Sequence, residues 1–172
     1  HRRKTGRSQY VDLSQREAAI NWVGESVLDY QIDGTEPRQI GNRDAVMAPS
    51  GVYRCDGEDS WIALAVGSDA EWQGLCTAIG RDAMAAQYAT QAERAEHHDD
   101  IDAAITEWTT TRTADEAMTL LQQHGVAAGV CANNRRVVND PHLVERGFWP
   151  EVDHPSAGRH RVAGVTWQYD RT

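Results

Sequence analysis

The stretch PRQIGNRDAVMAPSGVYRCDGEDSWIALAV, residues 37–66, decides the fold because it joins a turn-rich loop to the clearest pair of strands in the chain. The dipeptide Asp56-Gly57 within it favours the positive φ angles of tight hairpin turns. Trp61–Val66 follows as an apolar run rich in strand-forming residues. We therefore expect a β-hairpin that is preceded by a loop.

That loop, residues 41–51, combines two glycines, an asparagine and a proline with few apolar anchors. A loop of this composition is held at its ends and is free to line a pocket. A loop of this length also commonly serves only as a connection. Both roles stay open on the pattern alone.

Helix and strand signals alternate along the rest of the chain. A Ser or Thr three residues before a Glu has the spacing of a capping box, which satisfies the free amides of a helix start. This spacing occurs at Ser14, Ser68 and Thr113. We expect further helix starts near His97 and Asp140, and strands over Ser8–Leu13, Val126–Ala132, Phe148–Val152 and Arg161–Tyr169. Apolar residues at helical spacing, Ile20, Val23, Val27 and Tyr30, predict a buried stripe on the first helix. The alternation of helices and strands predicts an α/β fold.

Composition excludes several classes of partner. The chain has 172 residues, 40% of them apolar and 25% charged, which is ordinary globular composition. A net charge of −9 argues against nucleic acid, because binding to phosphates depends on clustered cations. The longest apolar run, Trp61–Val66, is far shorter than the roughly 20 residues that span a bilayer, so we expect no membrane partner.

The cysteines indicate a reducing compartment. Cys55, Cys76 and Cys131 are odd in number and lack CxxC spacing, which favours free thiols in the cytoplasm over a disulfide framework. Cys55 and Cys131 lie beside strand-like apolar residues, and we expect both to be inert packing thiols.

The local chemical motifs are weak. The run His97-His98-Asp99-Asp100 has metal-ligand residue types, but adjacent helical positions point in different directions, so a charged helix start is the favoured reading over a metal site. The carboxylates near Asp56 favour a solvated hairpin tip over an acid/base pair. No GxSxG, P-loop or GxGxxG sequence is present. The side chains of this sequence therefore predict neither a catalytic residue nor a metal site.

Five segments in order resemble the family III CoA-transferases, also called the CaiB/BaiF family. They are RRKTGRSQYVDLSQREA at residues 2–18, PRQIGN at 37–42, AEWQGLCTAIG at 70–80, NDPHLVERG at 139–147 and HPSAG at 154–158. Each segment alone is weak, but their order along nearly the whole chain is specific to this family.

The resemblance implies a transferase that moves CoA from an acyl-CoA to a carboxylic acid through an aspartyl-CoA thioester. CoA and acyl-CoA would be substrates, and no cofactor would be permanently bound. The reactive aspartate of the family lies upstream of the first matched motif, so this sequence resembles a C-terminal portion that would be inactive alone. Residues 1–30 would lead out of a Rossmann-like large domain, 31–125 would form a small α+β domain, and 126–172 would return to the large domain. Full-length relatives form homodimers with interlocked chains.

In the formyl-CoA branch of the family, a glycine-rich loop at the position of residues 42–51 covers the active site. The present loop has no glycine run, so we expect wall-forming contacts from Asn42, Pro49, Ser50 and Gly51 in place of a lid. Two alternatives stay open. One is an acyl-CoA racemase of the same fold, and the other is a non-catalytic subunit that completes an active site on another chain.

Overall fold

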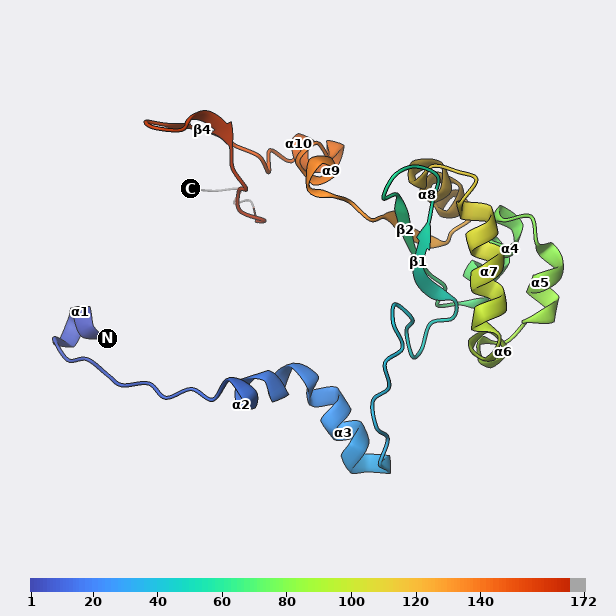
Figure 1. Cartoon of the computed structure of the whole chain (residues 1–172), viewed down its shortest axis with the longest axis horizontal. Helices are drawn as coiled ribbons and strands as arrows, with labels where there is room; N and C mark the ends of the chain where they lie inside the picture. Colours follow the sequence, from blue (N-terminus) through green and yellow to red (C-terminus); the bar gives the residue numbers. More distant parts are fainter. Residues whose placement is uncertain (168–172) are drawn as a thin grey trace. The chain divides into compact units, whose positions relative to one another are not determined.

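The computed structural model describes residues 1–167, and its chain divides into two compact units (Figure 1). The first unit is His1–Gly41, and the second begins at Asn42. The first unit contains α1 (Arg2–Thr5), α2 (Gln15–Ile20), a 3-10 helix (Asn21–Val23) and α3 (Gly24–Asp33).

The predicted helix start at Ser14 is confirmed, because its hydroxyl accepts the amide N–H of Glu17 at 3.3 Å. The strand predicted over Ser8–Leu13 is wrong. This segment is irregular, and no described strand pairs with it. A strand needs a partner for its backbone hydrogen bonds, and local alternation does not supply one.

The buried stripe predicted for the first helix is also wrong. Ile20, Val23, Val27 and Tyr30 are between 39% and 59% exposed, and no residue of α2 or α3 is buried. Helical spacing gives a helix an apolar face, but it does not provide the element that covers that face.

The predicted hairpin is confirmed. β1 (Ser50–Arg54) pairs antiparallel with β2 (Trp61–Ala65), and Gly57 in the turn has a φ of 109°. β3 (Ala127–Val130) forms as predicted and pairs antiparallel with the other edge of β2, but the burial predicted for this strand is wrong, because none of its residues is buried. The three strands lie in the order β1-β2-β3.

Five helices pack with this sheet around one core. They are α4 (Asp69–Ala78), α5 (Asp82–Gln87), α6 (Gln91–Glu96), α7 (His98–Thr109) and α8 (Ala114–Gln123). Of these, α7 contacts β1, and α8 contacts β2 and β3. Figure 1 shows α7 beside β1. Alternate strand residues such as Tyr53, Ile62 and Leu64 point into the core, as the period of two requires. The core residues that are fully buried include Ile62, Val66, Trp72, Leu75, Ile101, Ile105 and Leu121.

The helix starts are set by side-chain caps. Thr113 and Glu116 form the predicted reciprocal box at the start of α8. A second reciprocal box, Thr90 with Glu93, begins α6 and is absent from the sequence-based prediction. At α4 only half of the predicted box forms, because the Glu71 carboxylate accepts the Gly67 N–H at 2.6 Å.

The chain ends with short elements. These are α9 (Asn134–Val138), α10 (Pro141–Glu145), β4 (Glu151–His154) and β5 (Gly158–Arg161). The predicted helix at Asp140 is confirmed, and its carboxylate accepts the Leu143 N–H at 3.0 Å. The first predicted C-terminal strand is confirmed in part, because β4 includes Glu151 and Val152. The second is wrong: β5 shares only Arg161 with it, residues 162–167 form no strand, and positions 168 and 169 lie outside the described residues. In the part of the chain that the structure describes, no helix is long and apolar enough to cross a membrane.

Candidate functional site

The four residues predicted to form a pocket wall lie at the two ends of the loop. Asn42 is exposed at its beginning. Pro49 and Ser50 are buried where the loop enters β1, and Gly51 beside them is partly buried. The structure therefore brings Pro49, Ser50 and Gly51 together as an anchored base, while Asn42 faces solvent.

The loop folds back on itself around Asp44. The Asp44 carboxylate accepts the backbone N–H groups of Val46 and Met47 at 2.7 and 2.9 Å. These two bonds lower the pKa of Asp44, since they stabilise its charged form. The Asp44 N–H donates to the Ser50 hydroxyl at 2.7 Å and ties the middle of the loop to the first residue of β1.

A buried arginine on α6 fixes the second half of the loop. Arg94 is 1% exposed, and its Nε donates to the Ala48 carbonyl at 3.0 Å. The guanidinium also donates to the Ala89 carbonyl at 2.9 Å and to the Asp69 carboxylate at 3.0 Å. It lies 5.6 Å from the centre of the Trp72 ring, within the range of a cation–π contact.

The first half of the loop is fixed to α7. The Arg43 guanidinium donates to the carboxylates of Asp99 and Asp102, the latter at 2.6 Å. Asp102 also accepts the Tyr53 hydroxyl from β1 at 2.7 Å. Burial, followed by the bond to Asp102, raises the pKa of Tyr53, so this phenol stays protonated. Arg43 holds the pKa of Asp99 below its usual value.

His98 completes this polar network. Its side chain is buried, and Nε2 accepts the Ser50 N–H at 3.1 Å. Neither reading of the His97–Asp100 run anticipated this role, since His98 is not a solvated helix start. Within residues 1–167, no cluster of three or more His, Cys, Asp or Glu side chains could hold a metal ion.

Sequence reasoning missed Arg43, Tyr53, Arg94 and Asp102 as well as His98. The hydrogen bonds that connect these residues with one another and with the loop join positions 46 to 59 residues apart in the sequence. No local spacing signals contacts of that range. A cation within a loop and two carboxylates on the face of a helix are ordinary surface features in sequence.

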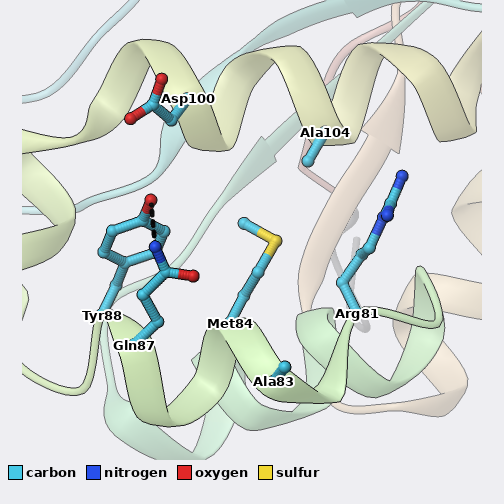
Figure 2. A pocket seen from close by; sticks show the side chains of 7 residues that line it. All are labelled: Arg81, Ala83, Met84, Gln87, Tyr88, Asp100 and Ala104. Carbon is cyan, nitrogen blue, oxygen red and sulfur yellow. Dashed lines mark hydrogen bonds between the residues drawn. The ribbon is translucent and has the colours of Figure 1, made fainter.

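Two open pockets lie along α7, between Asp100 and Trp108. Figure 2 shows one of about 290 Å³, in which Met84 lies between Tyr88 and Arg81 and faces α7. Gln87 donates to the Tyr88 hydroxyl at 3.0 Å. An adjoining pocket of about 330 Å³ is lined in part by Trp108 and Arg112. The four predicted wall residues line neither pocket.

The cysteines differ from the prediction in one respect. Cys55 and Cys76 are buried, as expected for Cys55, but Cys131 is exposed and is therefore not a packing thiol. Cys131 directly follows β3 and lines an open pocket together with Trp61 and Ala114. Desolvation raises the pKa of Cys55 and raises that of Cys76 to about 12.

We expect iodoacetamide to modify Cys131 alone at neutral pH, because reaction needs an accessible thiolate. Peptide mass spectrometry of the native protein should find carbamidomethyl groups on Cys131 and none on Cys55 or Cys76. A Cys131→Ser variant is the matched control and should remain unlabelled. Modification of Cys76 at a similar rate would mean that its helix opens readily.

Comparison with known proteins identifies the family to which this chain is similar. A family model described as CoA-transferase family III matches residues 1–172. The succinyl-CoA:mesaconate CoA-transferase of Haloarcula marismortui is 31% identical over 157 residues, which cover 91% of this chain and 39% of that protein. The succinyl-CoA–D-citramalate CoA-transferase of Chloroflexus aurantiacus is 29% identical over 167 residues, covering 95% of this chain and 41% of that protein.

A solved structure shares the fold. The crystal structure of a CaiB/BaiF family protein from Brucella suis matches with a TM-score of 0.77 at 22% identity, over 99% of this chain and 44% of that chain. The predicted mixed fold of helices and strands is thereby confirmed. This chain spans less than half the length of each of these three proteins. The family predicted from the five ordered segments is confirmed by the match over residues 1–172: the chain belongs to CoA-transferase family III.

Proposed function

We propose that this chain is the part of a CoA-transferase that scaffolds and walls a thioester pocket, in an enzyme that moves CoA from an acyl-CoA to a carboxylic acid. The observation that supports it is the family match over residues 1–172, together with curated relatives that are named as CoA-transferases. CoA is a substrate in this proposal, and no cofactor is bound permanently.

The reactive aspartate lies on polypeptide outside these residues. It attacks the acyl-CoA carbonyl, so that a mixed anhydride forms and CoA leaves as its thiolate. The thiolate then attacks the aspartyl carbonyl of the anhydride, giving an aspartyl-CoA thioester and releasing the first acid. The second acid attacks this thioester, which forms a second mixed anhydride and releases the CoA thiolate. The thiolate then attacks the carbonyl of the second acid, giving its acyl-CoA and freeing the aspartate. Splitting the exchange in this way avoids one difficult direct transfer.

The environment of Asp102 supports the proposal that the reactive aspartate is a different residue. Asp102 is the carboxylate at the loop base, with a side chain only 27% exposed. Its oxygens already bind Arg43 and Tyr53, at 2.6 and 2.7 Å. Each carboxylate oxygen thus accepts a hydrogen bond within this network, which makes both oxygens weaker nucleophiles. We assign Asp102 to holding the loop.

The loop contributes to the pocket in two ways. The exposed part that begins at Asn42 supplies the wall contacts, while Pro49, Ser50 and Gly51 anchor it to the sheet. In the domain scheme, residues 1–30 leave the large domain, 31–125 form the small domain and 126–172 return to the large one. The full-length enzyme would be a cytoplasmic homodimer with interlocked chains.

The test is CoA exchange by the full-length protein that contains this chain. An acyl-CoA carrying deuterium at its α-carbon is incubated with a second carboxylic acid, and both thioesters are followed by mass spectrometry. We expect the second acid to gain CoA while the first acyl group keeps its deuterium. Loss of the label without exchange would reject the transferase and support a racemase. Exchange that requires a separate partner protein would instead identify this chain as a non-catalytic subunit.

A further inference from the structure

His98 lies where the loop, β1 and α7 meet. It is the first residue of α7 and is 5% exposed. Its Nε2 accepts the Ser50 N–H at 3.1 Å, which ties α7 to the first residue of β1. A backbone N–H is only a donor, so Nε2 must be unprotonated and the ring proton must lie on Nδ1.

The same nitrogen has a second partner within reach. Oδ1 of Asp102, one turn further along α7, lies 3.5 Å from Nε2 of His98. A protonated Nε2 cannot accept from Ser50, because two donors would then face each other. It can donate to the Asp102 carboxylate, to which Arg43 and Tyr53 already donate. The two partners of His98 therefore correspond to two protonation states.

We propose that His98 is a positioning residue: its neutral imidazole holds Ser50, where the loop at residues 42–51 joins β1, and protonation moves the imidazole to Asp102 and releases this junction. This role goes beyond the proposed function, because it concerns the conformation of the loop and not the chemistry of transfer. Its consequence for a thioester pocket rests on the proposed function.

The release depends on the contact between His98 and Ser50 in particular. Ser50 accepts the Asp44 N–H at 2.7 Å through its hydroxyl and donates its own N–H to His98. Loss of the imidazole acceptor leaves the Ser50 N–H buried and unsatisfied, which destabilises this junction. The Arg43 ion pairs and the Arg94 bond to Ala48 stay in place, so the change is confined to the junction of the loop with β1.

The charged groups that face His98 set the direction of its pH dependence. Burial is the largest influence and lowers the pKa of His98, and the positive charge of Arg43 lowers it too. Asp102 and Asp99 on its own helix act in the opposite direction. The Ser50 N–H from β1 donates to the unprotonated nitrogen and so favours the neutral ring. The net shift is downward from 6.5.

The sign of the linkage follows from that shift. The unfolded chain takes up the proton at a higher pH than the folded one. The stabilisation from the His98–Ser50 bond is therefore complete above about pH 6.5 and is lost as the pH falls below it. At neutral pH the bond is intact and the loop is held.

Hydrogen exchange at the Ser50 amide in the full-length protein tests this role. Protection factors, corrected for intrinsic exchange, are compared between about pH 7.5 and about pH 5 by NMR or mass spectrometry. We expect protection of Ser50 to fall about tenfold at the lower pH, the equivalent of one hydrogen bond. In His98→Gln, whose side-chain oxygen accepts the N–H but does not titrate, protection should be the same at both pH values.

His97→Gln is the matched control. His97 is the preceding residue, its side chain is 46% exposed and its acidic neighbour is Asp100. This variant should keep the pH dependence of the unmodified protein. An unmodified protein with constant Ser50 protection, or a His98→Gln variant with the same tenfold fall, would overturn the proposal.

A second measurement tests the proposal without the variant, in case His98→Gln does not fold. Nitrogen-15 chemical shifts of the His98 ring in the unmodified protein report its tautomer. We expect the Nδ1–H form at neutral pH, and the Nε2–H form would overturn the proposal. Neither measurement uses catalysis. If the full-length protein showed no CoA exchange, the proposed function would be rejected, and the result for His98 would be unaffected.

Discussion

Replacing Arg94 by leucine is expected to lower the free energy of unfolding by about 3 kcal/mol. The substitution leaves the carbonyl of Ala48 without its donor, and Ala48 is 2% exposed, so little water reaches it. The stacking of the guanidinium on Trp72 is also lost. Urea unfolding followed by tryptophan fluorescence measures the change.

Arg81→Leu is the control for Arg94→Leu. Arg81 donates to Glu107 at 2.7 Å, but the two side chains are 49% and 71% exposed. An exposed ion pair contributes about 1 kcal/mol or less, so this variant should stay close to the unmodified protein. If the two leucine variants lost equal stability, the anchoring role of Arg94 would be wrong.

Gly74→Val is expected to destabilise the chain by about 3 kcal/mol or more, through a clash between α4 and α8. A Cβ built on Gly74 lies 2.1 Å from the backbone oxygen of His124, the residue that ends α8. That oxygen belongs to the backbone, so relief requires the two helices to move apart. The separation would open the core at Leu75 and Leu121, both fully buried. The same urea titration reports the loss.

Gly129→Val provides the matched comparison, because it makes the same change on β3. A Cβ at Gly129 meets nothing within 4 Å, and valine favours strands, so stability should be unchanged or slightly higher. Equal destabilisation by the two valines would show that the effect at Gly74 comes from the loss of glycine itself. Equal tolerance would show that the two helices separate at little cost.

The elements that the sequence predicts well are those that local chemistry specifies. Asp56-Gly57 gives the hairpin because a positive φ is needed within that turn, and Gly57 has it. Thr113 with Glu116 gives the start of α8 because both halves of the capping box lie within four residues. Short-range signals of this kind depend on no other part of the chain.

The features that sequence analysis missed depend on contacts between distant segments. Arg94 appears as an ordinary helical cation until the loop carbonyl of Ala48 is placed over it. His98 appears as half of a polar pair until Ser50 is brought to its Nε2. The prediction that the stripe including Val27 is buried was wrong for the complementary reason. Its apolar residues have helical spacing, but nothing in their own unit covers them. Residue pattern determines which face is apolar, and tertiary structure determines its neighbours.

The central claim is that the reactive carboxylate belongs to polypeptide outside these 172 residues. Hydroxylamine converts an enzyme-bound aspartyl thioester to a hydroxamate, which marks the residue by mass. The full-length protein is incubated with an acyl-CoA, treated with hydroxylamine, digested and mapped by mass spectrometry. We predict one hydroxamate, on an aspartate outside this sequence, and none when the acyl-CoA is omitted. A hydroxamate on Asp102, or on any other carboxylate within these residues, would contradict the account.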